Sequence, residues 1–207
     1  MRMLDLFCGA GGCSRGYHDG FTAAGLDVEV VGVDVNPQPN YPYEFVQADA
    51  MTFPLDGFDF IHASPPCQAF SVARVIHDND HPDLLTPTRE RLIAAGVPWV
   101  MENVPGAPMR RDVVLCGSMF GDRRLRRHRW FELWDATLMP LVPPCHHEFE
   151  RVSVFGHGGD VYHTVDVWRE VMGIDWMGRK ELAQAIPPAY TSFLASQIAP
   201  SLMEVPA

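Results

Sequence analysis

Residues 65–71 read PPCQAFS, and Cys67 within them is a candidate nucleophile. The segment follows the apolar run Phe58–Ala63, which is typical of a buried strand. A thiolate at the start of such a loop can attack an electrophilic carbon if its pKa is lowered. The two prolines restrict the backbone before the cysteine, which suits a nucleophile that needs one fixed position. The ordinary alternative is a buried cysteine that serves as a small apolar side chain.

Two further polar motifs adjoin apolar runs. Glu102 opens the segment ENV at 102–104 after Trp99–Met101, and a carboxyl there can hydrogen-bond or protonate a ring nitrogen. Arg127 and Arg129 precede Trp130-Phe131, and alternate residues of a strand share one face. Two guanidinium groups on that face could hold a base carbonyl and a phosphate.

A glycine-rich segment, DLFCGAGG at 5–12, follows the apolar start of the chain. Glycines let the backbone approach a ligand closely, and the N-terminus of the next helix offers free N–H groups. Asp34 and Asp49 end the next two apolar runs, where carboxylates could accept ribose hydroxyls and an adenine amino group. The turn alone is also compatible with NAD or FAD, or with no ligand, because its spacing is not GxGxxG.

The elements that must position these residues alternate in type. Apolar runs separated by helical stretches predict an α/β fold with a mostly parallel, doubly wound sheet. The predicted strands are Met3–Phe7, Val28–Val35, Phe45–Ala48, Phe58–Ala63, Trp99–Val104 and, more weakly, Val113–Leu115 and Trp130–Leu133. Helices are predicted at Ser14–Ala24, with Ser14 as N-cap, at Pro87–Ala95, with Gly96 as C-cap, and at 166–177.

The alternation stops near Met139, and three segments are predicted. Residues 1–138 form a cofactor-binding and catalytic domain, 139–165 a small irregular insertion, and 166–207 a C-terminal segment that packs back on the first. No apolar run is long enough to span a membrane, so we expect a cytoplasmic protein.

Charge and cysteine usage give weaker signals. The net charge of −10 argues against nucleic-acid binding, but five arginines at 123–129 could form a local phosphate-binding patch. Cys145-His146-His147 is the only local cluster that could suggest zinc. It lacks a second cluster at ligand spacing, so we expect no metal.

Taken together and in this order, the motifs resemble those of the DNA cytosine-5 methyltransferases. The matching segments are DLFCGAGG at 5–12, Asp34, Asp49, PPCQAFS at 65–71, ENV at 102–104 and RHR at 127–129. PCQ followed about 35 residues later by ENV is a specific combination. The resemblance covers roughly the first 135 residues.

This resemblance implies a Rossmann-like S-adenosylmethionine-dependent methyltransferase fold and methyl transfer from S-adenosyl-L-methionine to carbon 5 of cytosine in DNA. It implies that Cys67 attacks, Glu102 holds the cytosine ring, and Arg129, with Arg127 close by, assists. Because the target atom is inaccessible inside a duplex, the base must flip out.

The resemblance and the motif positions together predict the contact residues. Those expected at the cofactor are Asp5, Phe7, Gly9, Ala10, Gly11, Asp34, Val35, Asp49, Ala50 and Pro65. Those expected at DNA are Gln68, Ser71, Arg74, Arg123 and Arg124.

Two departures from the family concern target recognition. The large target-recognition region that usually follows RxR is reduced to roughly 35–40 residues, too few for a second folded domain. A Gly-Asn pair usual before the C-terminal prolines is replaced by Ala183-Gln184-Ala185-Ile186-Pro187-Pro188. These features predict a compact, phage-like form from a prokaryotic setting, acting as a monomer or weak homodimer. Its target would be about two to four base pairs, by the discrimination each contact supplies.

Two alternatives stay open at this point. The same cysteine, cofactor and glutamate would serve an enzyme that methylates cytosine in RNA, such as tRNA. A catalytically silent DNA-binding homologue is the other, although such a protein has no need of the nucleophile.

Overall fold

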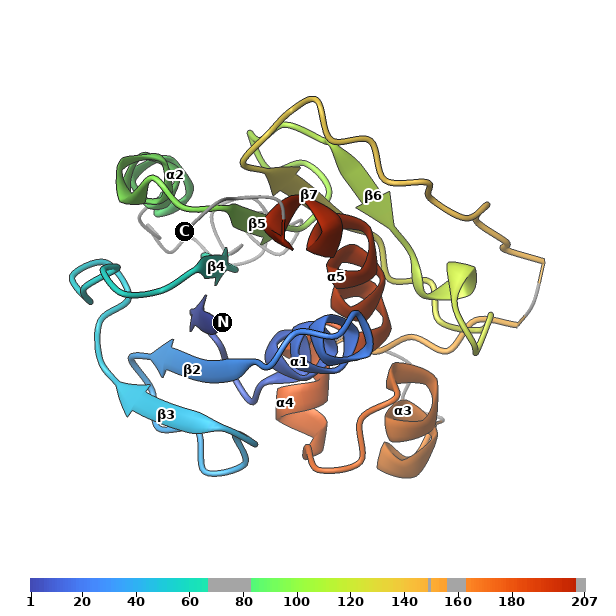
Figure 1. Ribbon diagram of the computed structural model, residues 1–207. Coiled ribbons are helices and arrows are strands. Elements are labelled where there is room, and N and C mark those ends of the chain that lie inside the picture. Colours follow the sequence, from blue (N-terminus) through green and yellow to red (C-terminus); the bar gives the residue numbers. More distant parts are fainter. Residues whose placement is uncertain (67–82, 149, 156–162, 204–207) are drawn as a thin grey trace.

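A seven-stranded sheet organises the computed structural model, which describes residues 1–66, 83–148, 150–155 and 163–203 (Figure 1). The strand order is β3-β2-β1-β4-β5-β7-β6. The strands are β1 (Arg2–Leu6), β2 (Glu29–Asp34), β3 (Glu44–Gln47), β4 (Phe60–Ala63), β5 (Trp99–Asn103), β6 (Val113–Leu115) and β7 (Arg129–Leu133). β1 to β5 pair in parallel and β7 pairs antiparallel with both neighbours, which confirms the predicted mostly parallel α/β fold.

The chain reverses its direction across the sheet at β1. From β1 it proceeds outward through β2 and β3, then returns to place β4 on the other side of β1. In open α/β sheets, ligands bind in the crevice at the carboxyl ends of the strands where this reversal occurs. The glycine-rich turn after β1 and the segment after β4 both begin there.

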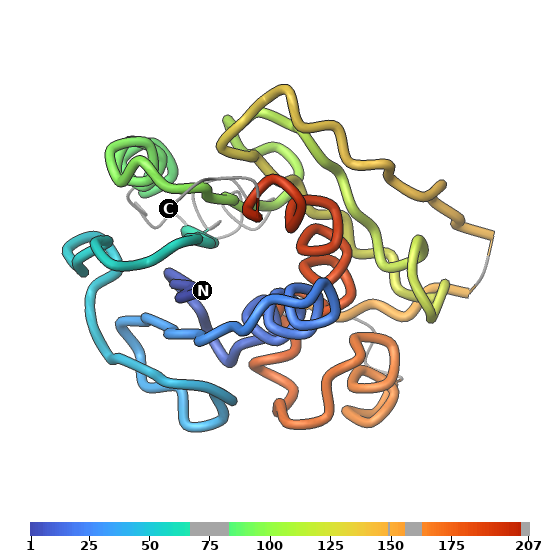
Figure 2. Tube along the Cα trace, in the orientation of Figure 1, coloured from blue at the N-terminus to red at the C-terminus, as the bar shows by residue number. Residues whose placement is uncertain are grey.

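Helices cover the two faces of the sheet (Figures 1 and 2). α1 (Gly12–Ala23) and α5 (Pro188–Met203) share one core with Met3, Val30 and Phe60. α2 (Leu85–Ala95) packs on the opposite face, where the alternate strand residues Leu4 and Ile61 point. Side chains of successive strand residues point to opposite faces, which explains the near-continuous apolar strands of the sequence.

A third, smaller core lies beside α1. It contains Trp168 and Met172 of α3 (Val165–Met172), Leu182 of α4 (Arg179–Gln184), and Val152 and Val154. A parallel bridge joins Leu125 to Val152. The insertion therefore contacts the rest of the fold through its described residues, while the boundaries at 138 and 165 stay predictions. No helix in the described part of the chain is long and apolar enough to cross a membrane.

Two local predictions differ from the structure, and α4 and α5 were not predicted. The helix expected at 166–177 ends at Met172, because Gly173 adopts φ 66 and closes it. Ser14 lies inside α1 and is buried, and Gly11 is the N-cap. α5 was not predicted, because its apolar residues surround the helix and leave no periodic polar face in the sequence.

A buried carboxyl, Asp5, lies under the turn that follows β1. The Ser14 hydroxyl donates to Asp5 Oδ2, and Ser14 Oγ lies 2.7 Å from the Tyr41 hydroxyl. Burial raises the pKa of Asp5 to about 7, with the charges of Asp34 and Glu102 adding to the rise and the Ser14 hydrogen bond opposing it. The hydrogen bond from Ser14 thus joins β1 to α1 on both sides of the turn. Asp5 is only 1% exposed, so its role here is structural.

We predict that replacing Gly16 with alanine destabilises the fold. A Cβ on Gly16 would lie 2.1 Å from the Pro188 carbonyl oxygen and 2.1 Å from Thr191 Oγ1, so α5 would have to move away from α1. Overpacking of this kind costs about 1–3 kcal/mol, which exceeds the gain in helix propensity. Urea unfolding measures the change. Gly121→Ala is the control, because no described atom lies within 4 Å of its Cβ position. A Gly16→Ala protein as stable as wild type would contradict this contact.

We predict that Asp5 makes stability depend on pH. Its folded pKa of about 7 exceeds the usual 3.8, so folding favours the protonated carboxyl. This contribution is complete below the unfolded pKa and is lost as pH rises through 7, by about 1.4 kcal/mol for each pKa unit of difference. Urea unfolding of Asp5→Asn and wild type from pH 5 to 8 should show the variant gaining relative stability as pH rises.

His62 contributes an opposing pH dependence to the stability of both proteins. Subtracting the unfolding free energy of wild type from that of Asp5→Asn cancels this contribution. Burial lowers the pKa of His62 to about 3 in the folded state, so its contribution is lost as pH falls. A free-energy difference between Asp5→Asn and wild type that does not change with pH would show that Asp5 is ionised in the fold.

Candidate functional site

The turn after β1 forms an open cradle. Gly9 and Gly11 have φ of 50 and 82, and Phe7 has φ 59, which a non-glycine residue rarely adopts. Such backbone strain is concentrated at functional sites. No described atom lies within 4 Å of a Cβ position on Gly9, whereas a Cβ on Gly11 would meet Pro42 Cδ at 2.6 Å. The turn is therefore packed on one side and open on the other.

Asp34 at the end of β2 holds this turn. Its Oδ2 accepts a hydrogen bond of 3.1 Å from Gly9 N, and its Oδ1 accepts one of 2.9 Å from Asn36 N. A carboxylate has about four acceptor positions, so both oxygens can still accept hydroxyl groups. Val35 beside it is 63% exposed, which leaves an apolar surface next to the carboxylate.

Asp49 lies two residues after β3, the edge strand next to β2, and is the second predicted cofactor carboxylate after Asp34. Its carboxylate is exposed, and Oδ1 accepts 2.8 Å from Met51 N. Ala50 is buried, and its carbonyl accepts from Arg91. The predicted cofactor residues thus divide into an open set around Gly9, Val35, Asp34 and Asp49, and buried supports such as Asp5 and Ala50.

These residues fit a nucleoside ligand. The open side of Gly9, the apolar Val35 and the two carboxylates lie at the carboxyl ends of adjacent strands, where such ligands bind. Among the described residues, no side chain caps the N-terminus of α1, so its N–H groups point into the same region. The ligand implied by the sequence, S-adenosylmethionine, has the ribose and adenine that this arrangement suits.

The segment that leads to Cys67 is anchored on the other side of β1. Asn103 Nδ2 donates to the Pro65 carbonyl at 3.0 Å, and Asn103 Oδ1 accepts from Val104 N at 2.9 Å. Ser64 Oγ lies 2.8 Å from His62 Nε2. Cys67, Gln68, Ser71 and Arg74 lie outside the described residues. Asn103 had no predicted role, although a polar residue that ends a buried strand signals one.

Glu102 and Arg129 form a buried ion pair in front of this segment. Arg129 Nε lies 2.9 Å from Glu102 Oε1, with side-chain exposures of 12% and 7%. Burial raises the pKa of Glu102, while Arg129, a hydrogen bond with Ser64, and Arg127 lower it. The carboxyl can therefore carry a proton more readily than an exposed glutamate, and its orientation is fixed.

Arg127 has a different position from the one predicted. β7 begins at Arg129, so the two arginines do not share one face of a strand. Arg127 is buried and donates from Nη1 to the Val154 carbonyl at 2.6 Å and from Nη2 to the Ala183 carbonyl at 2.8 Å. It therefore connects the residues before β7 to the third core. Its positive charge also lowers the pKa of Glu102.

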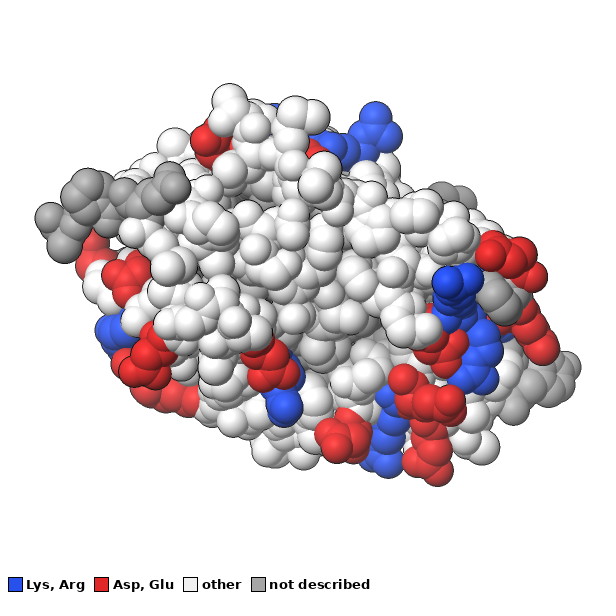
Figure 3. Space-filling view, turned by 45° about the vertical axis from the view of Figure 1, so that its right-hand side comes forward, with Lys and Arg blue, Asp and Glu red and all other residues white. Residues whose placement is uncertain are grey.

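The arginines expected at the DNA backbone differ in their surroundings. Arg124 pairs with Asp122 and, at 3.0 Å, with Glu170, so carboxylates offset its charge. Arg123 is exposed next to it. The face in Figure 3 shows Lys and Arg side chains among Asp and Glu side chains, without a continuous basic patch. Phosphate binding at these two residues stays a prediction.

Comparison with known proteins identifies the family. Residues 1–113 match the family model of the C-5 cytosine-specific DNA methylases, more than half of the chain. No curated protein matches. Solved structures that match include an RNA methyltransferase from Salinibacter ruber in complex with S-adenosyl-L-homocysteine, at 13% identity and a TM-score of 0.38, over 70% of this chain and 86% of that one.

The matched region contains the glycine-rich turn, both aspartates, Cys67 and Glu102 in the order in which the strands present them. The methyl donor is S-adenosylmethionine, in agreement with the nucleoside-binding arrangement of the turn and Asp34. The chain belongs to the family of C-5 cytosine-specific DNA methylases.

Proposed function

We propose that this protein methylates carbon 5 of cytosine in DNA, with Cys67 as a transient covalent nucleophile and the target base flipped out of the duplex. The observation that carries the proposal is the buried pair of Glu102 and Arg129 beside the anchored Pro65. Glu102 lies at the end of β5 next to Asn103, whose side chain holds the Pro65 carbonyl, and Pro65 precedes Cys67 by two residues in the sequence. A fixed carboxyl near a nucleophile suits the activation of a pyrimidine ring. S-adenosylmethionine supplies an electrophilic methyl group when bound.

In the proposed reaction, the Cys67 thiolate adds to carbon 6 of the ring, and the carbon 5–carbon 6 π electrons move toward carbon 5. Glu102 donates a hydrogen bond or a proton to N3, which offsets the negative charge that develops in the ring. Carbon 5 would then form its bond to the methyl group while the methyl–sulfonium bond breaks and S-adenosylhomocysteine leaves with that electron pair. Loss of the carbon 5 proton to a base restores the double bond and expels the thiolate.

Glu102 suits this role because its surroundings have two opposing effects on its pKa. Burial raises its pKa, which favours the protonated carboxyl that can donate to N3. The guanidinium of Arg129 limits that rise and fixes the orientation of the carboxyl group. Arg129 is thus a positioning residue, and Arg127 supports it through its bonds to Val154 and Ala183.

The proposed DNA contacts are Gln68, Ser71, Arg74, Arg123 and Arg124, together with the insertion at 139–165. The described part of that insertion is short and is partly committed to the third core through Val152 and Val154. It can place only a few base contacts, each supplying about 1–3 kcal/mol of discrimination, so we propose a target of about two to four base pairs.

We predict that Cys67→Ser abolishes methyl transfer to duplex DNA and leaves the fold and cofactor affinity unchanged. The hydroxyl is a much weaker nucleophile than the thiolate at neutral pH. Tritiated methyl donor with duplex DNA or with tRNA as acceptor, followed by nucleoside analysis, measures both activity and substrate.

Wild type should yield 5-methyldeoxycytidine from DNA and little product from tRNA. Preferential labelling of tRNA would replace DNA by RNA as substrate, and no labelling of either would favour a silent homologue. Cys13→Ser is the matched control, since Cys13 is buried in the core that α1 shares with α5 and has no role in the proposed reaction.

We predict that Glu102→Gln lowers kcat by about 10²–10⁴-fold, the usual contribution of a general acid, with less effect on KM for the cofactor. Single-turnover methylation measures the chemical step. Glu132→Gln is a suitable comparison, because Glu132 is also buried in the sheet and pairs with an arginine, Arg89, at 2.8 Å. Equal losses in kcat for the two variants would mean that Glu102 acts only through stability.

A further inference from the structure

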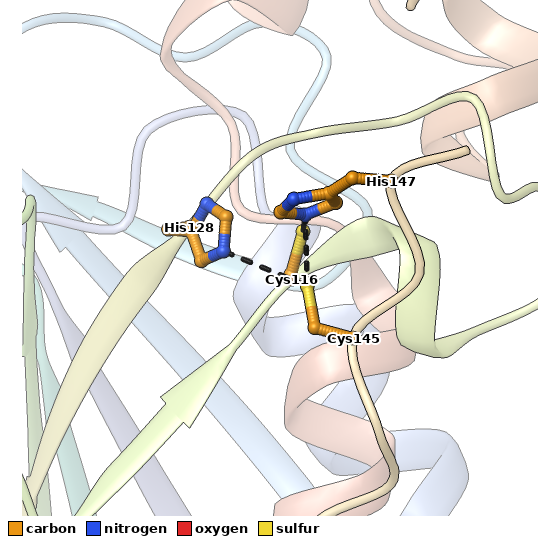
Figure 4. A group of neighbouring side chains, drawn as sticks. All are labelled: Cys116, His128, Cys145 and His147. Atoms are coloured by element: carbon orange, nitrogen blue, oxygen red, sulfur yellow. Dashed lines mark hydrogen bonds between the residues drawn. The ribbon is translucent and has the colours of Figure 1, made fainter. Parts of the chain in front are cut away.

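Four side chains with metal-binding atoms converge at the edge of the sheet away from the cofactor cradle. They are Cys116 at the end of β6, His128 just before β7, and Cys145 and His147 in the insertion (Figure 4). Their ligand atoms all lie within 4.8 Å of one another. We propose that these four residues bind a structural zinc ion.

The separations agree with tetrahedral coordination. His147 Nε2 lies 3.5 Å from Cys116 Sγ and 2.8 Å from Cys145 Sγ, and His128 Nε2 lies 3.7 Å from Cys145 Sγ. Zinc bonds near 2.3 Å to sulfur and 2.0 Å to nitrogen place such ligands about 3.5 Å apart. Two of the three separations already match, and the third needs to lengthen by a fraction of an ångström.

The donor set selects the metal. Two thiolates and two imidazoles are the ligands of structural zinc sites, and calcium or magnesium would require oxygen donors. Four protein ligands complete a tetrahedron and leave no position for water, which indicates a structural role rather than a catalytic one. Two thiolates also neutralise the charge of the ion.

The Ser118 hydroxyl contacts both sulfur atoms of the cluster. Its Oγ lies 3.4 Å from Cys116 Sγ and 3.2 Å from Cys145 Sγ, and it accepts 3.2 Å from His146 N. Hydroxyl contacts of this kind orient metal-bound sulfur atoms. His146 does not belong to the cluster and its Nδ1 lies 3.4 Å from Glu148 Oε1, so the adjacent histidines have different partners.

A zinc ion bound to these four residues would cross-link the insertion to the sheet. Described residues 139–148 form no helix or strand, and Met139 and Leu141 are 88% and 85% exposed. Zinc would tie this segment to β6 and β7, one residue before the Arg129 that pairs with Glu102. The sequence expectation of no metal arose because the second half of the cluster, Cys116 and His128, comes from distant strands and has no recognisable spacing.

Metal analysis of untagged protein, purified under reducing conditions, tests the proposal. We expect about one zinc per chain. Cys145→Ser and His147→Ala should each lose it, while His146→Ala, at the neighbouring position, should retain it. Ser118→Ala should lower zinc affinity by about 10–100-fold. Wild type that neither contains nor takes up zinc, or equal loss in His146→Ala and His147→Ala, would overturn the site.

A second measurement avoids dependence on folded variants. Wild-type protein stripped with a chelator under reducing conditions should take up one Co²⁺ and develop the intense visible bands of a tetrahedral site with sulfur ligands. Added zinc should displace the Co²⁺ and abolish these bands. Weak bands typical of octahedral cobalt, or a disulfide between Cys116 and Cys145 that persists under reduction, would contradict the proposal.

Discussion

The buried ion pair of Glu102 and Arg129 fixes the geometry of the candidate site and links β5 to β7. A carboxylate at the end of β5 cannot stay buried without a partner, and breaking such a pair costs about 3–5 kcal/mol. β7 supplies that partner because it runs antiparallel beside β5 and begins at Arg129. The preceding Arg127 is held by the Val154 and Ala183 carbonyls, and the Tyr190 hydroxyl of α5 donates to its carbonyl. The C-terminal third of the chain thus secures the position of one carboxyl group.

The remaining site elements meet at the reversal between β1 and β4. The open turn around Gly9 faces Asp34 on one side, and Asn103 holds Pro65 on the other. Beneath them Asp5, Ser14 and His62 form a buried polar layer between the sheet and α1. These three side chains are at most 1% exposed, and α1 packs closely against α5 at Gly16. The cofactor cradle and the described residues that lead toward Cys67 therefore both adjoin β1, since Ser64 N donates to the Leu6 carbonyl at 3.2 Å.

Local patterns predicted the strands and α2 well, because buried parallel strands are continuous apolar runs and Gly96 marks a helix end. The family motifs lie at strand ends for the same reason. These local patterns could not predict contacts between residues that are far apart in the sequence. Nothing near Arg127 in the sequence indicates its bonds to residues 27 and 56 positions away, and the cluster of Cys116, His128, Cys145 and His147 spans three segments. α5 escaped prediction because apolar residues such as Phe193 and Leu202 also lie outside its buried stripe, so its sequence has no clear polar face.

In the proposed mechanism, Cys67 becomes covalently attached to carbon 6 of a flipped cytosine during methyl transfer. Duplex DNA that contains 5-fluorocytosine tests it most directly, because fluorine cannot leave carbon 5 as a proton does and the thiolate therefore cannot be expelled. Incubation with S-adenosylmethionine, protease digestion and mass spectrometry of the nucleotide-linked peptide locate the bond. We expect a stable adduct on the peptide that contains Cys67, with the methyl group on the trapped base. An adduct on another cysteine, or efficient methylation elsewhere on the base without any adduct, would contradict it.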